Sequence, residues 1–201
     1  MSVAQSNAVR RAALGGIIGP VVFVAAWLCL GLGQARYSAV HDPISDLAGV
    51  HASSRIAMTT AFVLYAAGMG LYAIAVRATP GGPAWIAAAL TGAMTLGVAA
   101  FPLDHSSTVD RIHGAFAGAG YCALAATALL CAFRLTRLGR RGWARAAAAA
   151  GVVSGISLSL TLAGSFEGLF QRAGLTAGDI WVVASAVAIL RAPWATATTG
   201  R

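Results

Sequence analysis

Four histidines and six carboxylates are the side chains of this 201-residue chain best suited to chemistry. Asp110 and His113 stand three residues apart, a spacing that puts both on one face of a helix. A carboxylate beside an imidazole orients the ring, so that its free nitrogen can act as a base or bind a metal. Asp46, in an earlier connection, is a second possible carboxylate partner. We therefore take His113, Asp46 and Asp110 as the catalytic candidates.

Further polar residues fall in the same set of connections and are candidates for binding a ligand: His41, Asp42, Asp104, His105, Glu167 and Arg172. Two or three histidines with a carboxylate can hold Zn²⁺ with one position open for water. Such a metal would activate the water against an ester or amide of a lipid head group. The metal candidates are His41, His105 and His113, although no His-x-x-x-His spacing is present.

Three interpretations of this cluster stay open. In the first, the cluster locks loops together: Ser107 and Asp110 cap a helix, His113 bonds to the first connection, and Asp46 accepts backbone N–H bonds in a turn. In the second, it is a binding site without chemistry. In the third, it is a metal or acid–base enzyme.

Composition indicates which elements must position these residues. The chain is 58% hydrophobic and 10% charged, whereas soluble domains are about a quarter charged. Six apolar segments each come near the ~20 residues that span the hydrocarbon of a bilayer. We predict an all-α membrane protein, a single six-transmembrane-helix bundle over residues 1–201. The expected helices are 12–33, 56–76, 84–101, 108–133, 145–165 and 176–191.

The arginines orient this bundle. All 14 basic residues are Arg, and all but Arg36, Arg55, Arg111 and Arg172 fall on the side of the two termini. Cytoplasmic loops carry the excess of basic residues, so both termini should be cytoplasmic and the His/Asp cluster extracytoplasmic. The net charge of +8 then reflects membrane topology, and membrane lipids rather than nucleic acid are the expected partners. The Ala-rich, Lys-free composition indicates a bacterial inner (plasma) membrane.

Local patterns add detail. Ser107-x-x-Asp110 and Thr176-x-x-Asp179 resemble capping boxes. Residues 166–173 have apolar positions at helical spacing, which fits either a short amphipathic helix on the outer membrane surface or a packed connector. On the surface, Arg172 would meet a lipid phosphate. With these boundaries no helix core contains an ionisable residue, which argues against a pump or secondary transporter.

Small and polar residues recur at helical spacing. The pairs Gly15 and Gly19, Gly114 and Gly118, and Gly151 and Gly155 predict close helix contacts in lipid. The fifth segment carries a polar stripe on one face. This stripe predicts interhelical hydrogen bonds, with a polar cleft as the alternative; its members are Ser154, Ser157, Thr161 and Ser165.

Three short motifs carry a family resemblance. They are Ile44-Ser45-Asp46-Leu47, Phe101-Pro102-Leu103-Asp104 followed by His113, and Gly168-Leu169-Phe170-Gln171-Arg172. With these motifs nearly the whole chain resembles domain-of-unknown-function family 998, a group of bacterial and archaeal membrane proteins with about six helices. The Ile-Ser-Asp element is also similar to the Frag/DRAM/Sfk membrane family, some of whose members act in lipid-anchor remodelling. The resemblance implies the fold and, by analogy only, lipids.

The sequence therefore predicts an integral inner-membrane protein of unknown activity, whose extracytoplasmic His/Asp-lined polar site binds a lipid or small ligand. The alternative is a lipid-modifying hydrolase or acyltransferase, either metal-dependent or metal-free, that uses His113 with Asp46 or Asp110 at the outer leaflet. A small-molecule transporter is the third interpretation.

Overall fold

The computed structural model describes residues 3–79, 82–161, 164 and 166–191, and most of them are helical. The elements are α1 (Val3–Leu32), the short 3₁₀ helix η1 (Ile44–Ala48), α2 (Arg55–Arg77), α3 (Ala84–Ala100), α4 (Ser107–Arg137), α5 (Arg141–Thr161) and α6 (Glu167–Leu190). Five of these helices are long and apolar enough to cross a membrane, namely α1, α2, α4, α5 and α6. The predicted all-α membrane class is confirmed, and the protein is a multi-pass membrane protein.

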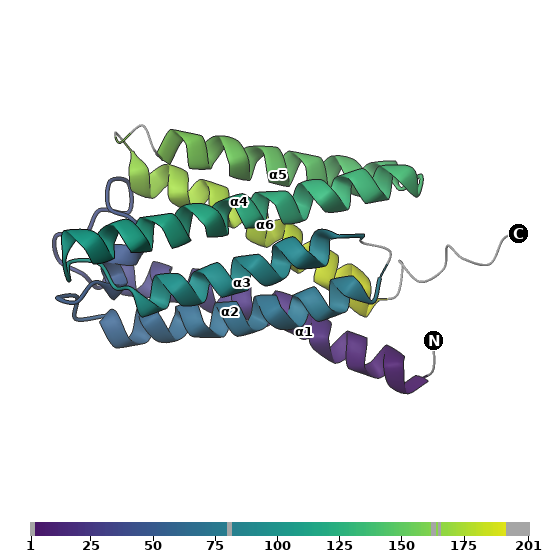
Figure 1. Cartoon of the computed structure of the whole chain (residues 1–201), viewed down its shortest axis with the longest axis horizontal. Coiled ribbons are helices and arrows are strands. Elements are labelled where there is room, and N and C mark those ends of the chain that lie inside the picture. Colours follow the sequence, from purple (N-terminus) through teal and green to yellow (C-terminus); the bar gives the residue numbers. More distant parts are fainter. Residues whose placement is uncertain (1–2, 80–81, 162–163, 165, 192–201) are drawn as a thin grey trace, which may run out of the picture.

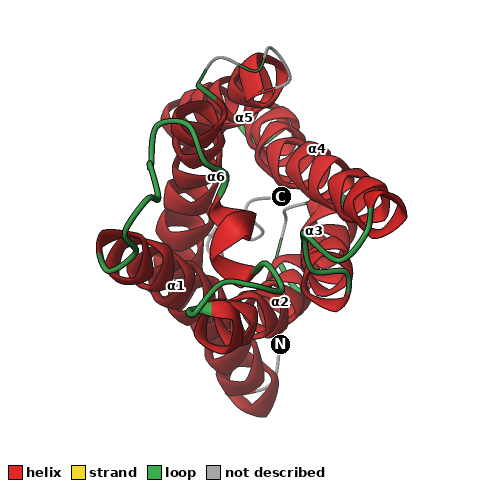
Figure 2. Cartoon of the chain, turned by 90° about the vertical axis from the view of Figure 1, so that its left-hand side faces the viewer, coloured by secondary structure: helices red, strands yellow, loops and turns green. Residues whose placement is uncertain are grey.

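The helices stand side by side in a closed ring (Figures 1 and 2). Each helix packs against its neighbours in the chain, and α6 completes the ring by packing against α1. The short helix η1 contacts α1, α2 and α6 and lies in the mouth of the ring. We call this end of the molecule the η1 end. The other end is the terminal end, because α1 begins there and α6 ends there.

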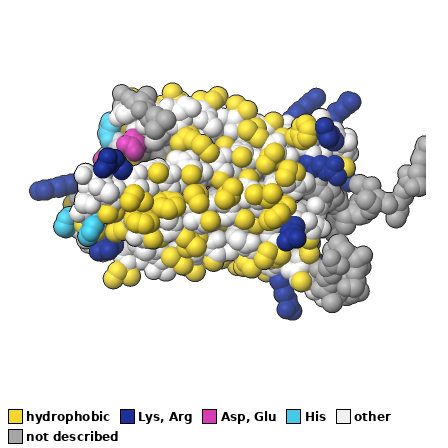
Figure 3. Space-filling model, in the orientation of Figure 1, with side chains coloured by type: hydrophobic (Ala, Val, Ile, Leu, Met, Phe, Trp, Pro, Cys, Tyr) yellow, Lys and Arg dark blue, Asp and Glu magenta, His cyan; other side chains and the backbone are white. Residues whose placement is uncertain are grey.

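Charged side chains gather at the two ends of the molecule, and an apolar belt separates them (Figure 3). In this view, histidine and acidic side chains are visible at no end other than the η1 end, whereas several basic side chains lie at the terminal end. Bulky apolar side chains on the belt point outward, among them Ile74 and Ile180, which are 58% and 63% exposed. A surface of this kind is suited to hydrocarbon rather than to water.

Helices α2 and α3 begin and end within one residue of the predicted bounds. Helices α1 and α6 differ most: α1 begins at Val3 rather than at residue 12, and α6 begins at Glu167 rather than at residue 176. The carboxylate of Glu167 in the first turn favours the helix N-terminus, and the first two turns pack into the bundle. Of the two interpretations of residues 166–173, the helix on the outer membrane surface is wrong: the segment is packed, with Gln171 and Arg172 each 7% exposed.

The predicted helix caps also need correction. Thr176 and Asp179 cannot form a capping box, because both lie inside α6. Helix α4 is capped one residue earlier than predicted: the side chain of Ser106, not Ser107, accepts a bond from the Val109 amide at 3.3 Å.

The polar stripe predicted on the fifth segment makes an interhelical hydrogen bond, as predicted: Ser154 donates to the Gly174 carbonyl of α6 at 2.7 Å. Ser165 lies outside the described residues.

The small residues of α1 make the predicted close contact. A Cβ atom built on Gly68 of α2 would lie 2.7 Å from the Gly15 carbonyl oxygen and 2.8 Å from the Gly19 Cα atom. Backbone therefore meets backbone at this crossing, which only glycine permits. At Gly114 and Gly118, by contrast, an added Cβ atom would meet nothing within 4 Å, so close packing is not what these two residues provide.

Candidate functional site

The first connection, residues 33–54, is held by the beginning of α6. The Gln171 side-chain oxygen accepts the Ile44 amide at 2.6 Å, and the Leu169 amide donates to the Val40 carbonyl at 3.0 Å. Arg172 reaches across with its guanidinium group and donates from Nη1 to the carbonyls of Ala39 (2.8 Å) and Asp42 (3.0 Å). The connection is thereby fixed over the mouth of the ring, by contacts other than those that the loop-locking interpretation named.

Arg172 uses its Nη1 and Nη2 donors within the protein, whereas its Nε atom is buried without a hydrogen-bond partner. Besides the two loop carbonyls, Nη1 donates to the Gly168 carbonyl at 2.9 Å, and Nη2 donates to the Tyr37 hydroxyl. The guanidinium carbon also lies 5.3 Å from the ring centroid of Trp27, within the range of a cation–π contact. A lipid phosphate would have to displace these partners. Ligand binding by Arg172 stays a prediction.

The connection between α3 and α4 is held in a similar way. Asp110 accepts the Asp104 amide at 3.1 Å. The Nδ1 atom of His113 lies 2.7 Å from the Phe101 carbonyl oxygen rather than bonding to Asp46. A carbonyl only accepts, so Nδ1 carries the proton and Nε2 is left with a lone pair. That Nε2 atom is buried and has no hydrogen-bond partner.

Asp46 lies in η1 and is half-buried. Burial, and then the negative charges of Asp42, Asp104 and Glu167, raise the pKa of the Asp46 carboxyl from 3.8 to about 6, while Arg172 opposes this shift. The η1 end therefore gathers carboxylates around one partly buried acid. A pKa in this range suits proton exchange near neutral pH, but the catalytic roles of Asp46, Asp110 and His113 remain predictions.

This pKa gives a stability prediction. The unfolded carboxyl loses its proton near pH 3.8 and the folded one near pH 6, so the folded state becomes less stable as pH rises through this interval. Asp46→Asn should match wild type at about pH 4 and, after allowance for solvent screening, exceed its free energy of unfolding by about 1 kcal/mol at about pH 8. Denaturation in detergent at both pH values measures the difference. A variant that is less stable at the higher pH would contradict it.

The metal candidates do not converge. His41 is exposed and stacks on Phe166 with ring centroids 5.6 Å apart, His105 is exposed, and His113 is buried. Within the described ranges, no group of three or more His, Cys, Asp or Glu residues is placed to hold a metal ion. Zinc stays a prediction without a ligand set.

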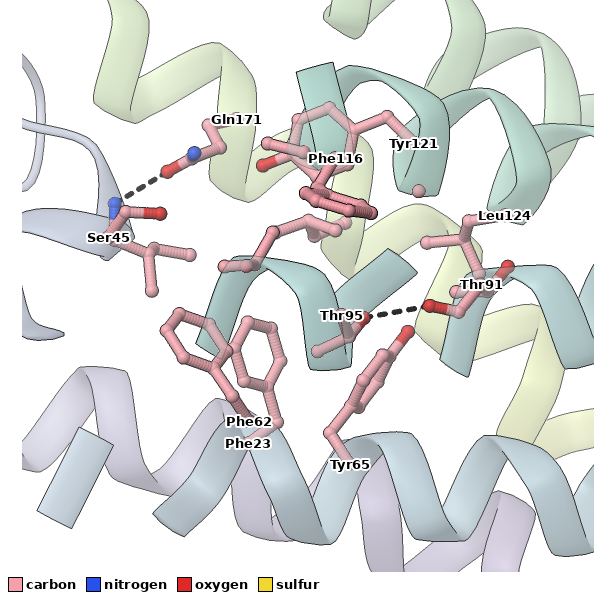
Figure 4. A pocket seen from close by; sticks show the side chains of 15 residues that line it. Phe23, Ser45, Phe62, Tyr65, Thr91, Thr95, Phe116, Tyr121, Leu124 and Gln171 are labelled. Carbon is pink, nitrogen blue, oxygen red and sulfur yellow. Dashed lines mark hydrogen bonds between the residues drawn. The ribbon is translucent and has the colours of Figure 1, made fainter. Parts of the chain in front are cut away.

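A cavity of about 50 Å³ lies inside the ring at the η1 end. Figure 4 shows Phe23, Phe62 and Tyr65 on one side of it, facing Phe116 and Tyr121 of α4. It is lined by residues of α1, α2, α3, α4, α6 and η1, so every helix of the ring except α5 contributes. None of the predicted site residues lines it, although Asp46 and Arg172 directly follow the lining residues Ser45 and Gln171.

The lining combines aromatic rings with uncharged polar groups. Thr91 and Thr95 bring hydroxyl groups from α3; each donates to a carbonyl of its own helix, at 3.0 and 2.9 Å. Their oxygens can still accept a bond from a ligand. The Gln171 side chain, which holds Ile44, joins the cavity to the locked connection above it. All of the lining residues are uncharged.

The family model described as "Protein of unknown function (DUF998)" matches residues 17–188. The chain belongs to this family. No curated protein and no solved structure matches the chain. The predicted family is thus confirmed, whereas the similarity of this DUF998 protein to the Frag/DRAM/Sfk family stays a resemblance of one short element. The match reaches all five lining helices and brings no activity with it.

One ionisable residue of this DUF998 protein lies in a helix core, where the sequence analysis predicted none. Asp179 is in the middle of α6 and only 3% exposed. Its Oδ1 atom accepts a bond from the Tyr65 hydroxyl at 2.9 Å, and its Oδ2 atom is buried without a partner. The expectation that the helix cores lack ionisable residues is wrong. Helix α6 begins at Glu167 rather than at residue 176, so Asp179 lies in its interior and not in its first turn. The composition of the helix cores therefore no longer counts against a transporter.

Proposed function

We propose that this DUF998 protein binds an uncharged amphipathic molecule, a lipid or small ligand with hydroxyl or carbonyl groups, in the cavity at its η1 end. The observation that carries the proposal is the lining of aromatic rings and hydroxyl groups without a charged side chain. A charged head group would lose its hydration here and gain no counter-charge, which is costly. A hydroxyl or ester group would instead exchange bonds with side chains such as Thr91 and Thr95.

The proposal includes an orientation. Six crossings, with both termini cytoplasmic in a bacterial inner membrane, put the cavity at the extracytoplasmic side, within reach of membrane lipids. The excess of arginines on the side of the termini supports this orientation. Helix α3 has 17 residues, at the lower end of the length that crosses a bilayer. Nucleic acid has no part in the proposal.

Filling the cavity tests the proposal. Ala117 lines the cavity, whereas Ala119, two residues further on α4, is exposed on the belt. Ala117→Leu should weaken ligand binding about tenfold, since overfilling a packed site costs about 1–3 kcal/mol. Ala119→Leu adds the same side chain on the lipid-facing surface and should bind like wild type.

The measurement is native mass spectrometry with lipid analysis of wild type and the two variants, purified in parallel in detergent. An uncharged lipid or small molecule retained by wild type and Ala119→Leu but depleted in Ala117→Leu is the expected result. Equal contents in all three proteins, or a retained ligand whose head group is charged, would refute the proposal.

One observation favours the enzyme alternative as a second candidate. The unprotonated Nε2 atom of His113 is buried without a partner, and His113 lies one helical turn from Phe116 and Ala117, which line the cavity. A neutral imidazole in this position is suited to act as a general base. The purified protein distinguishes the candidates: an enzyme would cleave or transfer a bound ester, whereas a binding protein would return it intact.

A further inference from the structure

A second hollow lies on the outside of the ring. It is a groove of about 570 Å³ between residues 20–28 of α1 and residues 176–184 of α6. Its lining is apolar except for Thr176 and Asp179. Val21, Leu28 and Ile180 line it while remaining 55%, 46% and 63% exposed, so the groove opens onto the apolar belt.

A hydrogen bond links the lining of this groove to the lining of the internal cavity. Asp179 lines the groove, and Tyr65 lines the cavity. The Tyr65 hydroxyl donates to the Asp179 Oδ1 atom at 2.9 Å. On α1 the two linings are adjacent in the chain, since Phe23 lines the cavity and the next residue, Val24, lines the groove. The linings of the two hollows therefore adjoin each other, and the Tyr65–Asp179 pair connects them.

We propose that the groove and the cavity form one lipid site, in which the uncharged head group occupies the cavity and the acyl tail lies in the α1–α6 groove. The lipid enters sideways from the bilayer, between Tyr65 and Asp179. This inference rests on the proposed function, because it requires a ligand in the cavity.

The rim of the groove selects an acyl tail rather than a neighbouring helix. Helices pack closely in lipid where small residues line the contact, but here branched side chains protrude, with Val21 and Leu28 on one rim and Ile180 on the other. A second helix would rest on these side chains and leave the floor empty. An acyl chain is narrow enough to lie between them.

Asp179 gives the passage its polar character. Its Oδ2 atom is buried and has no partner, which is costly in an apolar environment. When the Tyr65 bond opens, a glycerol hydroxyl can donate to Asp179 and accept from Tyr65, so that the exchange leaves both side chains paired. A purely apolar ligand would leave them unpaired. This selects a tail that carries a hydroxyl-bearing head, such as a monoacylglycerol.

Photocrosslinking can locate the tail. The probe is a monoacylglycerol with a diazirine near the end of its acyl chain, incorporated into phosphatidylethanolamine and phosphatidylglycerol vesicles that contain the full-length protein. We expect adducts concentrated in residues 20–28 and 176–184, and at least about fivefold fewer of them in Ala25→Phe, which fills the groove. Ala25 lines the groove and is exposed. Location is measured rather than affinity, because a tail gains no hydrophobic energy by leaving lipid for protein.

The matched control is Ala149→Phe, an exposed position on α5, which should crosslink like wild type. Adducts spread evenly over the belt, or unaffected by Ala25→Phe, would overturn the tail site. A second variant tests the route: Tyr65→Phe keeps the ring but removes the bond to Asp179, and it should speed adduct formation in the groove. An unchanged or slower rate would overturn sideways entry between these two residues.

A short-chain glycerol ester separates this inference from the proposed function. Its tail is too short to reach the groove, so it should stabilise wild type and Ala25→Phe equally against thermal unfolding, but not Ala117→Leu. If the ester gives this result but the diazirine probe gives no adducts in the groove, the cavity site is supported and the tail site is refuted. If the ester stabilises none of these proteins, the proposed function is refuted, and the tail site, which depends on it, is refuted as well.

Discussion

Replacing Arg172 with alanine should lower the free energy of unfolding by about 3 kcal/mol or more, because the buried Arg172 side chain bonds to four acceptors, which then lose their donor. The guanidinium group bonds to the carbonyls of Ala39, Asp42 and Gly168 and to the Tyr37 hydroxyl. These bonds join the first connection to α6 over the mouth of the ring. The variant should therefore lose the fixed position of residues 37–44 as well as overall stability.

Lysine should not restore what alanine removes. An ammonium group is a compact charge without the planar fork that lets one guanidinium reach acceptors on two sides. Arg111→Ala is the matched control, since Arg111 is exposed and, within the part of the chain that the structure describes, bonds to Ser107 and Thr108 in the first turn of α4; it should stay within ~0.5 kcal/mol of wild type. Denaturation in detergent and limited proteolysis of the first connection measure the effect. Wild-type stability of Arg172→Lys would show that charge alone matters here.

The burial of Arg172 and its hydrogen-bond partners could not be predicted from the sequence, unlike the membrane class. Segment lengths and hydropathy depend on the chain alone, so the membrane class and the bounds of α2 and α3 could be predicted. Glu167, Arg172 and Asp179 look like loop residues by the same criteria. Arg172 can be buried in a helix only because carbonyl groups of a connection some 130 residues earlier surround it, and nothing local to 167–179 reveals such partners.

One signal in the sequence could have found the true start of α6. Gly168, Leu175 and Val182 recur at seven-residue spacing, and Gly174 and Gly178 are four apart, so a single face continues through the supposed loop. Gly168 has a clear physical reason: a Cβ atom there would lie 2.3 Å from the Asp42 carbonyl oxygen. A helical face of small residues at this position indicates a buried helix start rather than a surface segment.

The cavity could not be predicted in the same way. Its lining side chains come from five helices and η1, and their convergence depends on how each helix is rotated about its axis. The rotation of a helix can be predicted from the sequence only where one face of that helix is clearly more polar than the others. Helix α3 is apolar on nearly all sides, so its rotation cannot be predicted in this way. The rim candidates were visible because they are charged, whereas Phe62, Thr91 and Tyr121 look like ordinary membrane-helix residues.

The rotation of α1 against α2 depends on Gly68, which leads to a second large effect. Gly68→Ala should destabilise the protein by about 1–3 kcal/mol, because the added methyl meets backbone, which cannot move aside as a flexible side chain would. The obstructing atoms are the Gly15 oxygen at 2.7 Å and the Gly19 Cα at 2.8 Å. Helix α1 must then shift away from α2 and carry Phe23 and Val24, which line the two hollows, with it.

Gly70→Ala is the matched control on the same helix. Nothing lies within 4 Å of its Cβ position, so only helix propensity changes, and the variant should gain up to ~1 kcal/mol. Denaturation in detergent compares the two substitutions, and short-chain ester binding reports on the cavity. Gly68→Ala should lose both stability and ester binding, whereas Gly70→Ala should keep both. Equal stability of the two variants would show that the α1–α2 contact is looser than the structure has it, and that the cavity wall does not depend on this crossing.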